Sequence, residues 1–276
     1  MIVQEIAQQS TDYLEKKKIP SARRVIEEML CSVLSLTRME LYLDFERPLN
    51  PDEIDSCRRI LARVAKGEPI QYVIGSVSFY DCDIEISSDV LIPRPETELL
   101  VDKIVKELAG QDLANKSLWD VCCGSGCMGI ALKKALPDLR VTLSDVSPKA
   151  LTQARINAEK NSVSVEFLEG SLLEPFQGRV DYLVVNPPYI SDGDFQQLSP
   201  SVKDFEPRLA LHGGVDGLDC YRVLAQDYKK FLNPAGKVWM ELGTGQGEEV
   251  KELFDGQGVV EKDWSGHDRF FSLEID

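Results

Sequence analysis

The sequence contains no uninterrupted stretch of about 18 apolar residues, the length that a membrane-spanning helix would need. Its first residues show no basic segment followed by an apolar one, so we expect no secretory signal. Seven cysteines in 276 residues are too sparse for a disulfide framework. We therefore expect free thiols in a reducing compartment and a cytoplasmic protein.

Metal-binding side chains are also scarce. Cys122, Cys123 and Cys127 lie close together in the sequence and could suggest a metal site. The chain has only two histidines, however, and no second cysteine pair at the spacing of a zinc site. We expect no bound metal.

Basic residues are fewer than acidic ones, and the difference lies almost entirely in the C-terminal part of the chain. The net charge is −15, of which residues 1–80 contribute −1, with 11 Lys/Arg and 12 Asp/Glu. Residues 81–276 contribute −14, with 20 basic and 34 acidic residues. This larger part would repel a nucleic-acid backbone and favour a cationic small molecule, although the same charge could serve solubility alone.

The N-terminal segment predicts helices up to about residue 66, because its apolar residues recur at helical spacing. Ser21 is expected to cap one of these helices. Asn50 is expected to cap another, with Pro51 at the first helical position and Glu53 three residues after the cap. We assign residues 1–68 to a helical domain.

Residues 69–92 are expected to form a β-hairpin linker between two domains. The short strands that it would contain are expected at 72–74, 79–80 and 84–86.

Residues 93–276 alternate between strand and helix patterns, which predicts an α/β domain with a mostly parallel sheet of seven strands. Strands are expected at about 118–123, 140–145, 164–169, 181–186, 236–242, 257–262 and 268–275. Helices are expected at 96–109, 126–136, 147–161, 219–232 and 246–254. Such sheets bind ligands at the carboxyl ends of their strands.

The strand that ends at Asn186 is followed by Pro187, Pro188 and Tyr189. Because proline has a fixed φ and no N–H, the strand must stop at Asn186. The freed carbonyls, the amide and the ring could together hold a planar group that bears an NH2. The alternative is a rigid turn with no ligand.

A glycine-rich loop follows the strand at 118–123. Gly124, Gly126 and Gly129 form a G-x-G-x-x-G pattern, and Asp145 ends the next strand about twenty residues later. This combination predicts an adenosine cofactor whose ribose hydroxyls bind Asp145. A tight turn with a capping acid would explain the same residues without a ligand.

The glycines alone fit a nicotinamide dinucleotide, and S-adenosylmethionine fits the remaining residues better. Asp120 lies four residues before Gly124, where a carboxylate suits an ammonium group and a sulfonium better than a pyrophosphate. Asp120 could equally be a structural acid that accepts hydrogen bonds from nearby backbone N–H groups.

The sequence resembles the release-factor glutamine methyltransferases from about residue 68 onward. The resemblance rests on the glycine loop, Asp145 and Asn186-Pro187-Pro188-Tyr189, together with residues 68–72, 91–98, 206–211, 216–218 and 241–243. It implies a Rossmann-like methyltransferase sheet and methyl transfer from S-adenosyl-L-methionine to the glutamine N5 of the Gly-Gly-Gln motif in peptide chain release factors. It also implies a role in translation termination, and we expect a monomer.

The resemblance also assigns residues to the site. The expected cofactor-binding residues are Asp120, Cys122, Cys123, Gly124, Ser125, Gly126, Asp145, Leu172 and Asn186. The expected catalytic and substrate-binding residues are Asn186, Pro187, Pro188 and Tyr189. Two departures concern the adenine side: Cys122 and Cys123 replace the family's usual Gly-Thr, and residues 170–172 replace an acid followed by an aromatic residue.

In the expected mechanism, Asn186 Oδ1 and the Pro187 carbonyl each accept one N–H of the substrate amide, and Tyr189 packs on its plane. His212 is expected to have no catalytic role, and the helices of residues 1–68 are expected to dock the release factor. The competing hypotheses are a methyltransferase acting on adenine N6, a nicotinamide-dependent oxidoreductase and a non-catalytic binding protein.

Overall fold

The computed structural model describes residues 1–275 and divides them into two compact units. The first unit comprises Met1–Gly75 together with Ser199–Phe205, and the second comprises Ser76–Leu198 and the described residues from Glu206 onward. No helix within the described residues is both long and apolar enough to cross a membrane.

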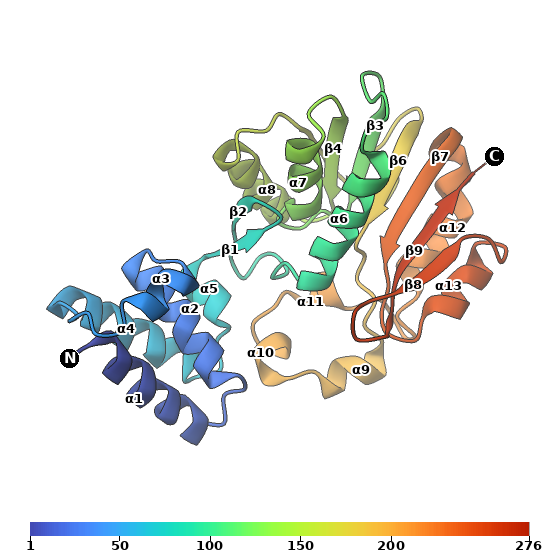
Figure 1. The fold of residues 1–276 in the computed structure, drawn as a ribbon. Helices are drawn as coiled ribbons and strands as arrows, with labels where there is room; N and C mark the ends of the chain where they lie inside the picture. The colour runs from blue at the N-terminus through green and yellow to red at the C-terminus, as the bar shows by residue number, and fades with distance from the viewer. Residues whose placement is uncertain (276) are drawn as a thin grey trace. The chain divides into compact units, whose positions relative to one another are not determined.

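The first unit is built of helices (Figure 1). In chain order they are α1 (Val3–Lys16), α2 (Ala22–Leu34), α3 (Arg38–Leu43), α4 (Pro51–Val64) and α5 (Ile70–Ile74), with α10 (Pro200–Lys203) contributed from later in the chain. One face of each long helix is apolar, and residues such as Leu14, Ile26, Leu30 and Leu41 are fully buried between the helices.

The predicted start of α4 is confirmed. Asn50 Oδ1 accepts a hydrogen bond from the Glu53 N–H at 2.9 Å, and Glu53 Oε2 accepts one from the Asn50 N–H, also at 2.9 Å. Ser21 does precede α2, but its backbone is left-handed with φ of 52° and its side chain caps nothing. The prediction that Ser21 caps this helix is therefore wrong.

The strand expected at residues 72–74 is also wrong, because these residues lie in helix α5. Pro69 stands at the N-cap, and Gly75 ends the helix with φ of 86°. The helix buries Ile70 and Tyr72. The apolar run has the composition of a strand, but the flanking proline and glycine limit it to little more than one helical turn.

The second unit contains a small antiparallel hairpin, β1 (Ser76–Phe79) with β2 (Cys82–Glu85), and a seven-stranded sheet of order β5-β4-β3-β6-β7-β9-β8. Its strands are β3 (Ser117–Val121), β4 (Arg140–Asp145), β5 (Glu166–Glu169), β6 (Val180–Val185), β7 (Leu232–Glu241), β8 (Val259–Lys262) and β9 (Asp268–Glu274). Strand pairs from β5 to β7 are parallel, and β9 is antiparallel to both its neighbours. The mostly parallel α/β sheet and each of its expected strands are confirmed.

Figure 1 shows α6 (Pro95–Leu108) and α7 (Cys127–Ala135) in front of this sheet, with α12 (Asp219–Phe231) and α13 (Gly247–Leu253) behind it. Helix α8 (Pro148–Lys160) contacts β4 and β5 at the edge of the sheet. These are the five predicted helices. The short helices α9 (Asp192–Gln197) and α11 (Arg208–Leu211) have too few turns for a periodic pattern and were not predicted.

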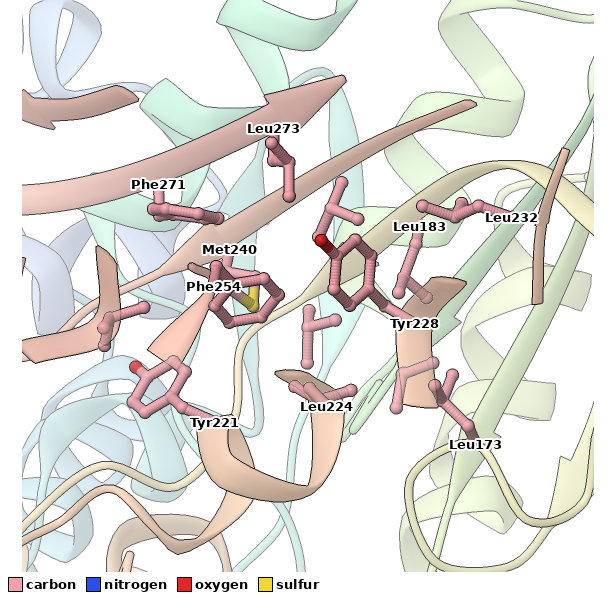
Figure 2. Close-up of a cluster of buried hydrophobic side chains, with 14 of the residues drawn as sticks. Leu173, Leu183, Tyr221, Leu224, Tyr228, Leu232, Met240, Phe254, Phe271 and Leu273 are labelled. Atoms are coloured by element: carbon pink, nitrogen blue, oxygen red, sulfur yellow. The ribbon is translucent and has the colours of Figure 1, made fainter. Parts of the chain in front are cut away.

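The core between the sheet and helices α12 and α13 is rich in aromatic side chains (Figure 2). Tyr228 packs against Phe254, and Phe254 against Phe271, with ring centroids 5.0 Å apart in both pairs. Full burial of such a side chain contributes roughly 1.5–3 kcal/mol. This packing fixes β7 and β9, and the carboxyl end of β7 carries part of the site.

Candidate active site

A cavity of about 440 Å³ opens at the carboxyl ends of β3, β4 and β6, where ligands bind to sheets of this kind. Eight of the predicted site residues line it: Cys122, Cys123, Gly124, Ser125, Asp145, Leu172, Asn186 and Pro188. Asp120, Gly126, Pro187 and Tyr189 do not line it and lie in the surrounding structure.

The glycine loop connects β3 to α7 in a tight turn. The Cys123 N–H bonds the Ser144 carbonyl at 2.9 Å, and the Gly126 N–H bonds the Cys123 carbonyl at 2.7 Å. Gly124 has φ of +53°, and apart from its own atoms and its chain neighbours no heavy atom lies within 4 Å of where its Cβ would stand. The backbone is therefore open to the cavity there, so that a ligand can approach it closely.

Cys122 also has a left-handed backbone, with φ of 60°. A residue other than glycine is uncommon in this conformation, and Cys122 belongs to the first of the two departures from the resembled family. Burial raises the pKa of the Cys122 thiol well above its ordinary value, so the thiol stays protonated. It contributes an uncharged, polarisable surface to the cavity.

Asp145 holds the entrance of the loop from the end of β4. Its Oδ2 accepts the Gly124 N–H and its Oδ1 accepts the Ser147 N–H, both at 2.9 Å. Burial raises the pKa of the carboxyl, and these backbone hydrogen bonds oppose the rise. Each carboxylate oxygen has a second lone pair, so Asp145 can still accept hydrogen bonds from a ligand in the cavity.

Asp120 is fully buried and does not reach the cavity. Its Oδ2 accepts the Gly129 N–H at 2.8 Å, and a Cβ on Gly129 would stand 2.8 Å from that same atom. Burial raises the pKa of Asp120 to about 7. This contact is the one expected if Asp120 is a structural acid, because it links the start of α7 to β3. The geometry gives no direct contact between Asp120 and a ligand in the cavity.

Asn186 follows β6 and is oriented by two side chains from other elements. Its Nδ2 donates to Glu241 Oε2 at 3.1 Å and to Thr97 Oγ1 at 3.3 Å. The Thr97 hydroxyl donates to the same Glu241 oxygen at 2.6 Å. Because Glu241 Oε2 is the acceptor in both contacts, the NH2 group of Asn186 faces Glu241. Asn186 lines the cavity, and its Oδ1 is therefore available to accept a hydrogen bond from a ligand there.

Tyr189 belongs to the same network. Its hydroxyl donates to Glu241 Oε1 at 3.2 Å, and burial raises its pKa above the ordinary value. The Tyr189 carbonyl accepts Gln246 Nε2 at 3.0 Å, and Gln246 Oε1 accepts the Gly243 N–H at 3.0 Å. The backbone of the Asn-Pro-Pro-Tyr segment is therefore anchored at its end as well as at Asn186.

Glu241 is the main residue of the site that reasoning from the sequence missed. It is 1% exposed at the end of β7. Burial raises the pKa of its carboxyl, while the Thr97 hydrogen bond and the Arg269 charge act to lower it. The available signal was a carboxylate that ends a strand two residues before Gly243, and this strand, β7, neighbours β6. Such a residue shares the carboxyl edge with Asn186, but sequence does not disclose that the two side chains meet.

Two further polar residues shape the cavity from outside. Buried Asn157 donates through Nδ2 to the Ser125 and Glu85 carbonyls at 2.9 Å, which ties the glycine loop to β2. Buried Glu206 accepts the Ile92 N–H at 3.2 Å and pairs with Arg94. These contacts fix the segment before α6, whose Pro93 lines the cavity.

His212 also lines the cavity, and its Nε2 lies 2.7 Å from Asp192 Oδ1. Its ring packs edge-on against Phe195. The absence of a catalytic role for His212 remains an expectation.

Comparison with known proteins agrees with this fold and identifies the family. A family model described as "PrmC N-terminal domain" matches residues 5–75, and one described as "Methyltransferase small domain" matches residues 95–201. The structure of a T. thermophilus 16S rRNA N2 G1207 methyltransferase covers 73% of this chain and 50% of its own, with a TM-score of 0.56 and 15% identity. This last likeness concerns the fold alone. The second unit is thus a Rossmann-like methyltransferase domain.

Two relatives narrow this class. The release factor glutamine methyltransferase of Geobacter sulfurreducens is 40% identical over 262 residues, which cover 93% of this chain and 91% of that protein. That of Chlamydia trachomatis serovar L2 is 38% identical over 276 residues, covering 99% and 94%. The chain belongs to the release factor glutamine methyltransferase family.

Proposed function

We propose that this protein transfers a methyl group from S-adenosyl-L-methionine to the side-chain amide nitrogen, N5, of the glutamine in the Gly-Gly-Gln motif of peptide chain release factors. The observation that carries the proposal is the fixed orientation of Asn186. Its NH2 group is taken by Glu241 and Thr97, so its Oδ1 is an oriented acceptor beside the cavity. A primary amide is a planar group that brings the matching N–H donors.

The cavity fits an adenosine cofactor. It offers the open backbone at Gly124, a carboxylate with spare lone pairs at Asp145 and an apolar surface at Leu172. S-adenosylmethionine would supply an electrophilic methyl group on a sulfonium. In the proposal, Asp145 accepts hydrogen bonds from the ribose hydroxyls, while Leu172 and Cys122 provide contact without charge.

An amide nitrogen is a weak nucleophile because its lone pair is delocalised into the carbonyl. Asn186 Oδ1 and the Pro187 carbonyl each accept one N–H of the substrate amide, which fixes the nitrogen and directs its lone pair. Tyr189 packs on the amide plane. No base is needed before transfer, since the proton can leave the nitrogen afterwards.

Residues 1–68 dock the release factor in this proposal, residues 69–92 form the connecting segment, and residues 93–276 carry the chemistry. The protein acts as a cytoplasmic monomer in translation termination. The family assignment supports the substrate, and the free thiols of all seven cysteines support a reducing compartment.

The test is methylation of a purified bacterial release factor, followed by mass spectrometry of the peptide that contains Gly-Gly-Gln. The proposal requires one added methyl group on that glutamine and none on a release factor whose motif glutamine is replaced by glutamate. An adenine-containing oligonucleotide serves as competing substrate. Methylation of the oligonucleotide with the release factor unmodified would favour the adenine N6 alternative instead.

A further inference from the structure

One tryptophan differs sharply from the other two in its surroundings. Trp119 and Trp239 are buried, with 6% and 3% of their surfaces exposed, whereas Trp264 is 90% exposed. A tryptophan side chain presents one of the largest apolar surfaces in proteins, and tryptophan is enriched among the residues that dominate binding energy at interfaces. Trp264 is thus available to a partner of this unit.

Four hydrogen bonds hold the turn that carries Trp264. Asp263 Oδ1 accepts the Ser265 N–H at 2.8 Å and the His267 N–H at 3.1 Å. The Asp263 N–H bonds the His267 carbonyl at 2.8 Å, and the Gly266 N–H bonds the Asp263 carbonyl at 3.0 Å. An anchor on such a turn loses little conformational freedom on binding.

The same turn is fastened to the end of β7. Arg269 Nε pairs with Asp263 Oδ2 at 3.3 Å, and its Nη1 donates to the Leu242 carbonyl at 2.9 Å. Leu242 follows Glu241, which orients Asn186. Because β9 runs antiparallel to β7 with Phe270 opposite Glu241, the turn before β9 lies at the sheet edge that holds the cavity.

A second exposed apolar residue lies on another loop attached to the site. Val215 is 80% exposed. The loop around it is held to the Asn-Pro-Pro-Tyr segment, because the Gly213 N–H bonds the Ile190 carbonyl at 2.9 Å and Gln246 donates to both the Tyr189 and Gly217 carbonyls. Exposed apolar side chains therefore lie on two loops. One is bonded to the end of β7 beside Glu241, and the other to the Asn-Pro-Pro-Tyr segment and the residue after it.

We infer that Trp264 is a docking anchor for the protein substrate, binding apolar residues that flank the methylated glutamine loop. The inference rests on the proposed function. The occupant is a protein segment because the turn is bonded through Arg269 to the end of β7, which carries Glu241, and so lies at the edge of the sheet where the substrate glutamine must enter. A nucleic acid could stack on an exposed tryptophan, but residues 81–276 carry a balance of −14, with 20 basic and 34 acidic residues, which disfavours a phosphate backbone.

The test compares Trp264→Ala with Trp264→Phe and with Val259→Ala, a matched control. Val259 is a 59% exposed residue at the far end of β8 from the turn. For intact release factor we expect Trp264→Ala to raise KM about tenfold to thirtyfold, the effect of a typical interface anchor, with kcat and the S-adenosylmethionine Kd unchanged. Trp264→Phe should recover most of the loss, and Val259→Ala should match wild type.

A fluorescence measurement adds a readout that does not depend on turnover. Trp264 is the exposed member of the three tryptophans, so the acrylamide-quenchable emission that Trp264→Phe removes belongs to it. Saturating release factor should protect this component from quenching.

An unchanged KM in Trp264→Ala, a fall in kcat alone, or undiminished quenching with release factor bound would overturn the inference. Protection by an oligonucleotide but not by release factor would also overturn it. If wild type methylates release factor and the Trp264 variants match it, the inference fails while the proposed function stands. If wild type does not methylate release factor, the proposed function itself fails.

Discussion

Asn186 Nδ2 lies 3.1 Å from Oε2 of Glu241, so a buried carboxylate at the end of β7 fixes the orientation of the amide at the end of β6. The two strands are neighbours in the sheet, with Val185 opposite Met240. Glu241 is thereby a positioning residue: it decides which atom of Asn186 is presented to the cavity.

The first prediction concerns Glu241→Gln. A glutamine side chain can donate as well as accept, so the Asn186 amide is no longer forced into one orientation. We expect kcat to fall about tenfold to a hundredfold, the effect of weakening a hydrogen-bonded contact by roughly 1–3 kcal/mol. The Kd of S-adenosylmethionine, measured by calorimetry, should stay within twofold of wild type. A parallel rise in that Kd would mean that Glu241 supports the cofactor site instead.

Thr97→Val tests the same relationship from the other side. The variant keeps the shape of the side chain but removes both its hydrogen bond to Glu241 and the one it accepts from Asn186. We expect a smaller fall in kcat than in Glu241→Gln, because Glu241 still accepts from Asn186. A larger fall in Thr97→Val would contradict the assignment of Glu241 as the principal orienting group.

The third prediction is that Asp145→Ala weakens cofactor binding. Two ribose hydroxyls lose a charged acceptor, and the Gly124 N–H loses its partner at the entrance of the loop. Calorimetry should show a Kd for S-adenosylmethionine raised by about tenfold or more. If the Kd is unchanged while thermal stability falls, Asp145 only caps the turn.

Asp120 predicts a pH dependence of stability. Its pKa is raised from 3.8 to about 7 by burial, so between these values the folded protein holds a proton that the unfolded chain has released. The free energy of unfolding should fall as pH rises from 4 to 7, by up to about 1.4 kcal/mol per pH unit from this group. In Asp120→Asn this part of the slope should disappear, as denaturant titrations at pH 5 and pH 7 would reveal. Identical slopes in the two proteins would contradict the raised pKa.

The sequence predicted the elements whose signals are local. Helix α4 begins where Asn50, Pro51 and Glu53 mark its first turn, and the seven strands lie where apolar runs alternate with helical patterns. The residues 72–74 were misassigned because four or five apolar residues carry no reliable period. Only the flanking Pro69 and Gly75, and burial in the helical unit, favour a helix there.

The site shows where local reasoning ends. The glycine loop, Asp145 and Asn186 could be identified because strand ends of a parallel sheet meet at one edge. Glu241 and Thr97 could not, since their contacts with Asn186 span 55 and 89 residues of sequence. Asp120 had two open interpretations, and the choice between them depends on which way its carboxylate points relative to Gly129.

The most direct measurement is the single-turnover rate of release-factor methylation by Asn186→Ala beside wild type, with S-adenosylmethionine saturating. The account predicts a Kd for the cofactor close to that of wild type and a rate lower by about tenfold to a hundredfold, because the substrate amide loses a buried acceptor. Methylation of the Gly-Gly-Gln glutamine at the wild-type rate would contradict the central claim that Asn186 orients the reacting nitrogen.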